Sequence, residues 1–321
     1  MGGGGGGPIG TGGPGLTQQI TEIGRRINET NRKQLEELRL ERRLRVVENA
    51  ISRAPPDRLG VAFLDVGQGD GSVIKLPNGK VMVIDCNIER ATEDIVEFLK
   101  RTGVERVDYL VVTHPHYDHM SGLREIAEHF AVGELWRTEF TRKRENESPE
   151  SWETYQEYER TVQLMERRGT RVVFPKAASR PFRTEGAANI YCYSPSSRVP
   201  PEEQDIHTDS IVLHIGYGKS SVTFGGDMNR EGWERIATHY DIKSTVLHAS
   251  HHGADVGCNE TAVKQIRPEY TVISVGPNNF GHPHEGALET YKRNSRRGVL
   301  LTDEGSVGFL MNDSGSVASV Q

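Results

Sequence analysis

The chain has 321 residues, enough for one large domain or two small ones, and its 26% charged and 35% hydrophobic residues are typical of a soluble globular protein with some non-globular segment. Its 39 basic and 45 acidic residues give a net charge of -6 at pH 7. The chain as a whole therefore lacks the positive field that marks many nucleic-acid-binding proteins, although a local basic patch is compatible with this balance.

The three cysteines, Cys86, Cys192 and Cys258, are odd in number and far apart, which argues against a disulfide framework. No stretch reaches the ~20 apolar residues that a membrane span needs. The N-terminus has no charged region followed by an apolar core, so no signal peptide is predicted. We therefore expect a cytoplasmic protein without a membrane segment.

The first part of the chain differs in composition from the rest. Residues 1–15 are mostly glycine and are predicted to be disordered. Residues 16–54 are rich in Gln, Glu, Arg and Leu, and their apolar residues recur at helical spacing, so they are predicted to form a helical extension. The stripe fits a helix that mediates self-association or binds a partner protein, and it equally fits a helix lying on its own domain. Pro55 and Pro56 end this segment.

From residue 58 the pattern changes to strands and helices in alternation. Strands are predicted at 61–65, 72–76, 80–84, 107–112 and near residue 134, and helices at 92–101, 122–130 and 149–168. Two strand pairs follow, 171–174 with 189–193 and 211–215 with 220–224. Two β-sheets with helices on both outer faces would satisfy this order. Residues 58–312 would form this domain, and residues 313–321 a flexible tail.

The most informative segment is a turn that contains His114, His116, Asp118 and His119. It directly follows a predicted buried strand, and α/β folds place their chemistry at the carboxyl ends of strands. Three imidazoles and a carboxylate on one short turn are costly to fold unless something binds them. Neutral imidazole nitrogen and carboxylate oxygen both suit zinc-like divalent ions, so the turn predicts a metal-dependent hydrolase.

Further clusters follow later strands. Asp227 comes after two glycines, which would let the backbone pass close to an ion. His251 and His252 follow a short apolar strand, and His282 and His284 lie in a turn with glycine and proline. We interpret His282 as a functional residue and His284 as a turn residue. Because each cluster lies at a strand end, all of them can converge on one rim of the sheets.

Taken together, His-x-His-x-Asp-His followed by Gly-Asp and His-His-Gly resembles the metallo-β-lactamase superfamily. The chain is most similar to the hydrolase domain of the DNA-uptake protein ComEC and its stand-alone relatives. The segments that carry this narrower likeness are Phe-Leu-Asp-Val-Gly-Gln-Gly-Asp at 63–70, Ile-Ser-Val-Gly-Pro-Asn-Asn-Phe-Gly-His-Pro at 273–283 and Thr-Asp-Glu-Gly at 302–305. The likeness spans about residues 58–312 and does not include residues 1–54.

The resemblance implies an α/β fold, an αββα four-layer sandwich, preceded here by the N-terminal helix. It also implies two divalent metal ions, zinc or manganese. The implied ligands are His114 and His116 for the first ion, Asp118, His119 and His251 for the second, and Asp227 between the two. His251 is preferred to His252 because the strand end fixes it, whereas His252 is freer to face the substrate.

The third ligand of the first ion is less clearly marked by the pattern. Many superfamily members supply a histidine near this place, whereas the ComEC-like group more often has asparagine. His207 falls where a ligand could reach, and we take it as that ligand. Asp65 and Asp85 are expected to orient ligand histidines by accepting their free N–H groups.

Two such ions would activate a bridging hydroxide and hold the attacking and leaving oxygens of a phosphodiester. His252 or His282 would stabilise or protonate the departing oxygen, and Asp118 is taken as both a ligand and a catalytic residue. Nucleic acid is the favoured substrate class, and the cations of the insert after the metal turn could contact its phosphates or simply be solvated. These cations are Arg137, Arg142, Lys143 and Arg144.

Other functions stay open. The net charge argues mildly against a long duplex as substrate, so a small phosphodiester such as a cyclic nucleotide or a phosphocholine ester, or another ester, is the enzymatic alternative. A metal-bound interaction module without catalytic activity, docking a partner through residues 16–54, is the alternative of a different class.

Overall fold

The computed structural model describes Arg25, Glu29 and residues 47–88 and 94–320. The predictions for residues 1–15 and for most of 16–54 lie outside these residues. The chain divides into two units, residues 1–42 and 43–321. In the first unit, Arg25 and Glu29 are helical and form an ion pair of 2.7 Å, one helical turn apart. The second unit contains all the strands of the described chain.

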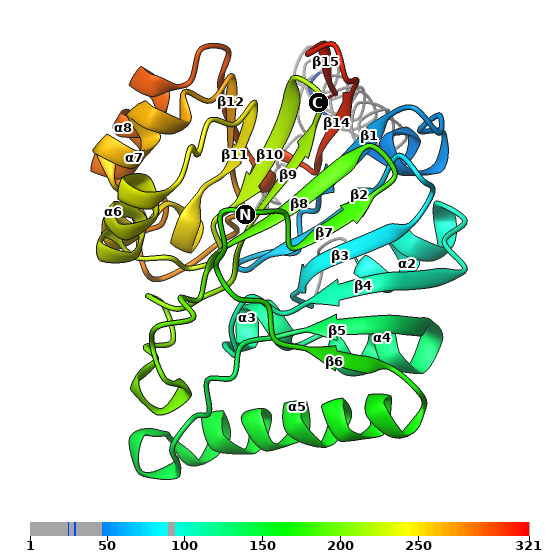
Figure 1. The fold of residues 1–321 in the computed structure, drawn as a ribbon, viewed down its shortest axis with the longest axis vertical. Helices are drawn as coiled ribbons and strands as arrows, with labels where there is room; N and C mark the ends of the chain where they lie inside the picture. The colour runs from blue at the N-terminus through cyan, green and yellow to red at the C-terminus, as the bar shows by residue number, and fades with distance from the viewer. Residues whose placement is uncertain (1–24, 26–28, 30–46, 89–93, 321) are drawn as a thin grey trace, which may run out of the picture. The chain divides into compact units, whose positions relative to one another are not determined.

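The first sheet of this unit has eight strands, with a mixed arrangement (Figure 1). β1 to β3 and the two C-terminal strands are antiparallel, and β3 to β6 are parallel. Across the sheet the strands are β15 (Val317–Val320), β14 (Val307–Met311), β1 (Leu59–Phe63), β2 (Gly71–Lys75), β3 (Val81–Cys86), β4 (Arg106–Val111), β5 (Ala131–Trp136) and β6 (Arg171–Val173).

The second sheet has seven strands. β10 to β13 are parallel, so their carboxyl ends lie at the same edge, and β7 to β10 are antiparallel. Across the sheet the strands are β13 (Gly298–Leu301), β12 (Tyr270–Ile273), β11 (Val246–His248), β10 (Ser220–Phe224), β9 (Val212–Tyr217), β8 (Ala188–Ser194) and β7 (Arg183–Glu185).

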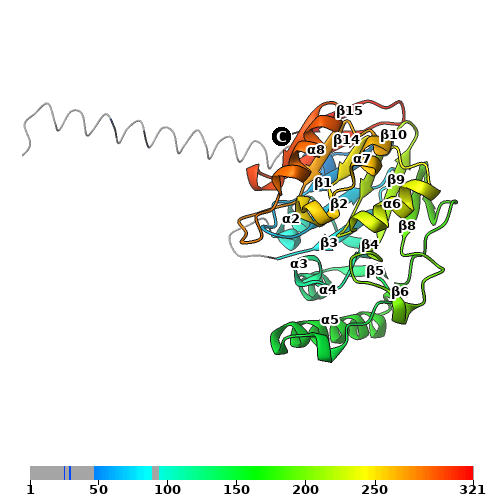
Figure 2. The same cartoon turned by 90° about the vertical axis from the view of Figure 1, so that its left-hand side faces the viewer.

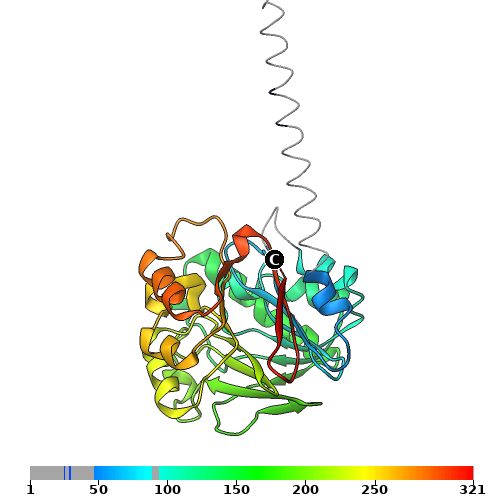
Figure 3. The same ribbon diagram turned by 90° about the horizontal axis from the view of Figure 1, so that it is seen from above.

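Helices cover the outer face of each sheet. Figure 2 shows the helices of the second sheet in front of its strands, and Figure 3 shows the two sheets face to face between the helical layers. The first sheet carries α2 (Ile95–Arg101), α3 (Tyr117–Met120), α4 (Leu123–His129) and α5 (Pro149–Arg167). The second carries α6 (Arg230–His239), α7 (Glu260–Ile266) and α8 (Glu285–Asn294). Short 3-10 turns are η1 (Arg144–Asn146), η2 (Pro201–Glu203), η3 (Ser250–Gly253), η4 (Asp255–Gly257) and η5 (Thr302–Glu304).

Alternation along the strands explains the layers. In β1, Val61 and Phe63 point toward the second sheet and join the core between the sheets, whereas Ala62 points toward the helices. Such period-two alternation lets one strand contribute to two hydrophobic layers at once. Three buried clusters result, one between the sheets and one under each helical layer. The predicted αββα four-layer fold is confirmed.

The structure differs from the sequence prediction in its strand pairing. β6 and β8, predicted to pair with each other, lie in different sheets. β6 continues the first sheet beside β5, and β8 pairs with β9 and with the short strand β7, which the prediction missed. The pair β9 and β10 is confirmed as an antiparallel hairpin.

The two ends of the domain also differ from expectation. The flexible tail expected at 313–321 does not hold for residues 317–320, because they form β15 and pair with β14. The reason is a tight turn after β14, with Gly315 at a φ of 94°, that folds the chain back along the edge of the sheet. At the other end, residues 47–52 are helical. Val47 and Ile51 are buried against the first sheet, so this part of the predicted helix packs on its own domain.

Cys86, Cys192 and Cys258 are all buried and free, in agreement with the predicted absence of disulfides. Among the described residues, no helix combines the length and apolar composition needed to cross a membrane. The cytoplasmic location stays a prediction.

Candidate metal centre

The histidine turn follows β4 and leads into α3. His114 and His119 are buried, with 1% and 0% of their surface exposed, and their ring centroids are 4.2 Å apart. His116 immediately precedes α3, and its Nδ1 is 3.0 Å from Nε2 of His114. The turn therefore places three imidazoles of one short segment against each other, as its sequence predicted.

Asp227 comes from the other sheet and approaches this turn from across the sandwich. It follows β10 through Gly225 and Gly226, and it is 2% exposed. Its Oδ1 lies 3.2 Å from Nε2 of His119, and its Oδ2 lies 3.6 Å from Nε2 of His114. One carboxylate thus faces both ends of the histidine turn.

The preceding glycines are required by close packing. Gly226 has a φ of 50°, and a Cβ there would lie 2.4 Å from Oγ of Ser210. A Cβ on Gly225 would lie 2.1 Å from Oγ of Ser250. The glycines were expected to let the backbone approach an ion. In the structure they let it pass these two serine side chains, and this places Asp227.

His251 and His252 lie in η3, directly after β11. Both have left-handed backbone, with φ values of 54° and 51°. Non-glycine residues in this region are uncommon and gather at functional sites, where the surrounding structure holds the strain. Asp85, at the end of β3, has the same feature with a φ of 55°. Three of the four such residues in the described chain therefore lie in this one site.

The two neighbouring histidines lie in different surroundings. His252 is buried, and its Nε2 lies 3.1 Å from Oδ2 of Asp118 and 3.8 Å from Oδ1 of Asp227. His251 is half-buried; its Nε2 lies 3.7 Å from Oδ2 of Asp227, and its ring is 4.8 Å from that of His207. The left-handed turn thus directs His252, and not His251 as expected from the strand end, toward Asp118 and His119. Which of the two histidines binds a metal stays a prediction.

Three groups of potential ligand atoms result in the described chain, and the ligand atoms of each lie within 4.8 Å of one another. One of them, Asp70, Asp85 and His119, shares His119 with the second of the two groups given below. His207 belongs to the first group, since its ring centroid is 4.9 Å from that of His116. The first group is His114, His116, His207 and Asp227, and the second is Asp118, His119 and His252.

Buried carboxylates contact ring nitrogens of the histidines. Oδ2 of Asp85 is 2.8 Å from Nδ1 of His119, and the carboxylate also accepts hydrogen bonds from the backbone and hydroxyl of Thr113. It therefore orients His119, as expected. Oδ1 of Asp65 accepts from the backbone of Gly67 in its own turn, at 3.4 Å, and the role expected for Asp65 stays a prediction.

Asp70 also lies among the histidines of the site. It is 3% exposed, and its Oδ1 lies 3.4 Å from Nδ1 of His252 and 3.7 Å from Nε2 of His248. His248 also contacts Oγ of Ser274 at 2.7 Å, which agrees with the packing role expected for it. The sequence signal for Asp70 was its place in the Gly-Gln-Gly-Asp turn, between two strands of the first sheet.

The charges of the site fit a bound cation. Burial lowers the pKa of His114 well below 6.5 and that of His116 to about 4, so both imidazoles are neutral at pH 7. Burial also opposes protonation of His119, but Asp227, Asp85 and Asp118 outweigh it and raise the pKa well above 6.5. The carboxylates thus demand positive charge at this place, which a divalent ion can supply.

Unpartnered buried atoms support the same conclusion. Nε2 of His119, Oδ1 of Asp227 and Oδ1 of Asp70 are buried without a hydrogen-bond partner in the described structure. Buried polar atoms of this kind are costly unless a ligand or ion satisfies them. Since these are donor atoms of the types that zinc and manganese take, the residues present fit divalent metal ions.

The rim of the site is partly aromatic. Tyr117 and Phe280 are 59% and 69% exposed, and the ring of Phe280 stacks on that of His282 with 5.6 Å between centroids. His282 lies over the buried group, 6.2 Å from His252. His284 accepts a hydrogen bond from the backbone of Asp255 at 3.0 Å, as a turn residue.

The cations of the insert are largely engaged within the protein. Arg137 is 8% exposed and is bonded through both terminal nitrogens to Glu159. Arg142 pairs with Glu147 and donates to the carbonyl oxygen of Pro115 at 3.1 Å, which ties the insert to the histidine turn. Arg142 therefore holds the histidine turn in place through this hydrogen bond.

These observations agree with a comparison against protein families, in which the model described as the metallo-beta-lactamase superfamily matches residues 64–276. The chain belongs to the metallo-β-lactamase superfamily. Within this class it is similar to competence proteins of the ComEC type. It is 25% identical to ComE operon protein 3 of Bacillus subtilis over 263 residues, which cover 76% of this chain and 32% of that protein.

A second curated relative is competence protein ComA of Neisseria gonorrhoeae, which is 25% identical over 265 residues, covering 81% of this chain and 33% of that protein. The chain thus spans about a third of the length of the curated relatives it matches. Among solved structures, it is similar to the metallo-beta-lactamase fold protein YhfI of Bacillus subtilis, with 13% identity, a TM-score of 0.48, and coverage of 81% of this chain and 99% of that one.

Proposed function

We propose that this protein is a metal-dependent phosphodiesterase that acts on nucleic acid. The observation that carries the proposal is the position of Asp227, whose two carboxylate oxygens face His119 and His114 from across the sandwich. A shared carboxylate between two ligand groups is the arrangement that a two-metal site requires. Two divalent ions would supply Lewis acidity and an activated water for attack at phosphorus.

In this proposal, zinc or manganese ions are held by the two groups. The first ion would take His114, His116 and His207, the second would take Asp118, His119 and His252, and Asp227 would serve both. Asp85 would hold His119 through Nδ1 of its ring. Nδ1 of His252 would be held by the carbonyl oxygen of Ser274 at 3.0 Å, with the carboxylate of Asp70 3.4 Å from the same nitrogen. Such supporting groups fix the ring orientation and make the imidazole a better ligand.

His282 is proposed to contact the phosphodiester rather than an ion. It lies beside His251 and His252, with ring centroids 5.9 and 6.2 Å away, and it is outside both ligand groups. Nδ1 of His282 is buried and has no hydrogen-bond partner in the described structure. Because a neutral imidazole still carries one N–H, His282 can donate a hydrogen bond to a phosphate or leaving oxygen.

Nucleic acid is the proposed substrate for two reasons. Two relatives are named ComE operon protein 3 and competence protein ComA, and we take these names to point to DNA. The exposed ring of Phe280 beside His282, and that of Tyr117 between His116 and Asp118 in the chain, are of the type on which unpaired bases stack, at about 1–3 kcal/mol per base. A single strand fits this rim better than a duplex, whose bases are already stacked.

A small phosphodiester is the second candidate. It is favoured by the internal pairing of Arg137 and Arg142, which leaves the insert without the basic track that a long polyanion would need. We also propose that residues 16–54 mediate self-association or bind a partner protein. In the non-catalytic alternative, the protein is an interaction module that binds metal without turnover.

The test begins with full-length protein stripped by a chelator and reloaded with zinc or manganese. We expect two ions per chain and metal-dependent cleavage of single-stranded DNA or RNA. Duplex DNA, a cyclic dinucleotide and bis-nitrophenyl phosphate complete the panel. Cleavage of the small substrates alone would favour the second candidate. Full metal loading without any turnover would refute the phosphodiesterase proposal in favour of an interaction module.

A further inference from the structure

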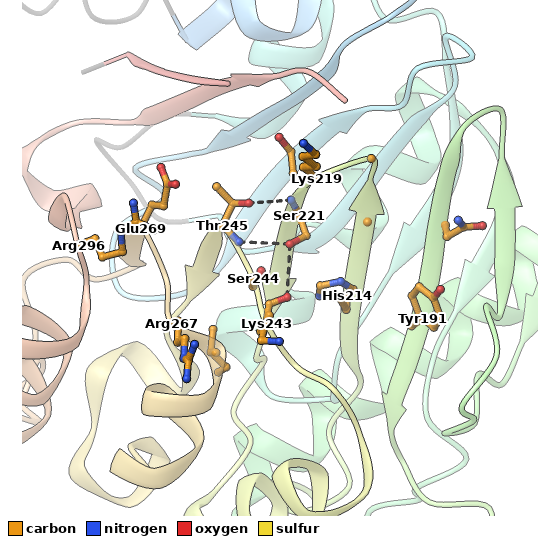
Figure 4. Close-up of a pocket in the computed structure, with 15 residues that line it drawn as sticks. Tyr191, His214, Lys219, Ser221, Lys243, Ser244, Thr245, Arg267, Glu269 and Arg296 are labelled. Carbon is orange, nitrogen blue, oxygen red and sulfur yellow. Dashed lines mark hydrogen bonds between the residues drawn. The ribbon is translucent and has the colours of Figure 1, made fainter. Parts of the chain in front are cut away.

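A second pocket lies at the opposite end of the strands that carry the metal ligands (Figure 4). It opens on the outer face of the second sheet, where β10 begins at Ser220 and the loop at 243–245 leads into β11. Asp227 and His252 follow the other ends of these two strands. Since an extended chain rises about 3.3 Å per residue, the stretch from Ser221 to Asp227 separates the pocket from the metal centre by up to about 20 Å.

Positive charge gathers around this pocket. Lys219, Lys243, Arg267 and Arg296 line it, against the single carboxylate of Glu269. That carboxylate already pairs with Arg297, at 3.2 Å.

Most of this positive charge is not neutralised. Lys219, Arg267 and Arg296 form no ion pair with any described residue, and Lys243 has only a loose contact of 3.8 Å to Asp241. In a chain with a net charge of -6, such a local excess of cations attracts anions.

The floor of the pocket supplies flat polar side chains. Tyr191 on β8 is half-buried, and His214 on β9 is 8% exposed. Nδ1 of His214 is bound to Oγ1 of Thr223 at 2.9 Å, which leaves Nε2 free for a ligand. Figure 4 shows Tyr191 and His214 on neighbouring strands, with Lys243 and then Arg267 following on the other side of His214.

The framework of the pocket is ordered by its own hydrogen bonds. The backbone of Ser221 donates to Oγ1 of Thr245 at 3.0 Å, and the backbone of Thr245 donates to Oγ of Ser221 at 3.2 Å. These reciprocal bonds fix the start of β10 against the start of β11. The cavity of about 510 Å³ is therefore a preformed site of the size that small ligands occupy.

From these features we infer that the pocket binds a nucleotide, with its phosphate at Lys219, Lys243, Arg267 and Arg296 and its base against Tyr191 and His214. The cations match a phosphate, and the aromatic floor and the volume match the attached nucleoside, which inorganic phosphate lacks. A free nucleotide and one unit of a nucleic-acid strand present the same phosphate and base, so the pocket accepts either source. The inference does not rest on the metal centre.

The experiment measures binding by titration calorimetry on full-length protein treated with a chelator, so that hydrolysis does not interfere. The probes are dAMP, inorganic phosphate and a short single-stranded oligodeoxynucleotide. The test variant is Lys243→Gln with Arg267→Asn, since asparagine tolerates the left-handed backbone of Arg267, which has a φ of 52°. The control is Lys100→Gln with Arg124→Gln, which removes the same charge from the helices of the first sheet.

We expect the test variant to bind dAMP at least roughly tenfold more weakly, and the control to bind as the wild type does. Tyr191→Ala should weaken the binding of dAMP but not that of inorganic phosphate. Tighter binding of the oligonucleotide than of dAMP would identify the strand as the source, and the reverse order would identify the free nucleotide. The inference is overturned if no probe binds, or if test and control variants lose affinity equally.

Discussion

The two ends of β10 and β11 carry opposite kinds of chemistry on the same pair of strands. At the carboxyl ends, Asp227 and His252 are buried. The loop of His252 contains left-handed backbone, and Oδ1 of Asp227 has no hydrogen-bond partner in the described structure. At the amino ends, Ser221 and Thr245 satisfy each other by hydrogen bonds, and the charged groups are exposed lysines and arginines. The first end is built to be completed by something bound, whereas the second is stable without its ligand. Substitutions should therefore have large effects at the first end and small ones at the second.

The largest effect is expected for Asp227→Asn. This change keeps the volume but removes the negative charge that faces both ligand groups, so we expect loss of metal from the site and a fall in turnover of roughly 10³-fold. The measurements are metal content by mass spectrometry and cleavage of the best substrate. Binding of dAMP at the pocket of Figure 4, called the far pocket below, should be unchanged, which shows that the two ends of the strands act independently. Normal metal content with undiminished activity would refute the bridging role of Asp227.

A smaller and more selective effect is expected at the neighbouring histidines. His252→Ala should weaken the second metal roughly 100-fold, because it removes a buried side chain from the group with Asp118 and His119. His251→Ala, its matched control in the same turn, should weaken metal binding by less than about tenfold. Competition with a chromophoric chelator measures both. Equal losses, or a larger loss for His251→Ala, would restore the assignment that the sequence suggested.

Sequence alone predicted the layered fold because the alternation of apolar residues and the strand–helix order are local signals. The histidine turn was visible for the same reason, since His114, His116, Asp118 and His119 are close in the chain. The sheet to which each of the later strands belongs was harder to predict. Whether β8 follows β6 in the same sheet depends on the path of the connection at 174–182, and alternation within each strand does not encode it.

Other parts of the site depend on contacts distant in sequence. The choice between His251 and His252 rests on a left-handed turn, which breaks the alternation that holds along a strand. Asp70 approaches His252 from a loop between the first two strands, so its role is invisible until the two sheets meet. The cations of the far pocket come from four separate loops and form no charge run in the sequence.

The smallest effect concerns the far pocket without its ligand. Burial lowers the pKa of His214 to about 4, with Asp241 acting weakly in the opposite direction, whereas an unfolded histidine titrates near 6.5. A histidine with a lowered pKa contributes stability that is present above pH 6.5 and is lost as the pH falls toward 4. Between pH 6.5 and about 5.5, this amounts to roughly 1 kcal/mol of unfolding free energy.

Urea denaturation of metal-free protein at several pH values in this range measures the loss, and His214→Gln should remove it because glutamine does not titrate. His239→Gln, which changes an exposed histidine on α6, is the matched control and should retain the wild-type slope. Parallel pH curves for wild type and His214→Gln would mean that His214 is not held neutral by burial. Water would then reach His214 at the floor of the pocket more than its packing indicates. The difference in burial between the two ends of the strands would be greater than we infer.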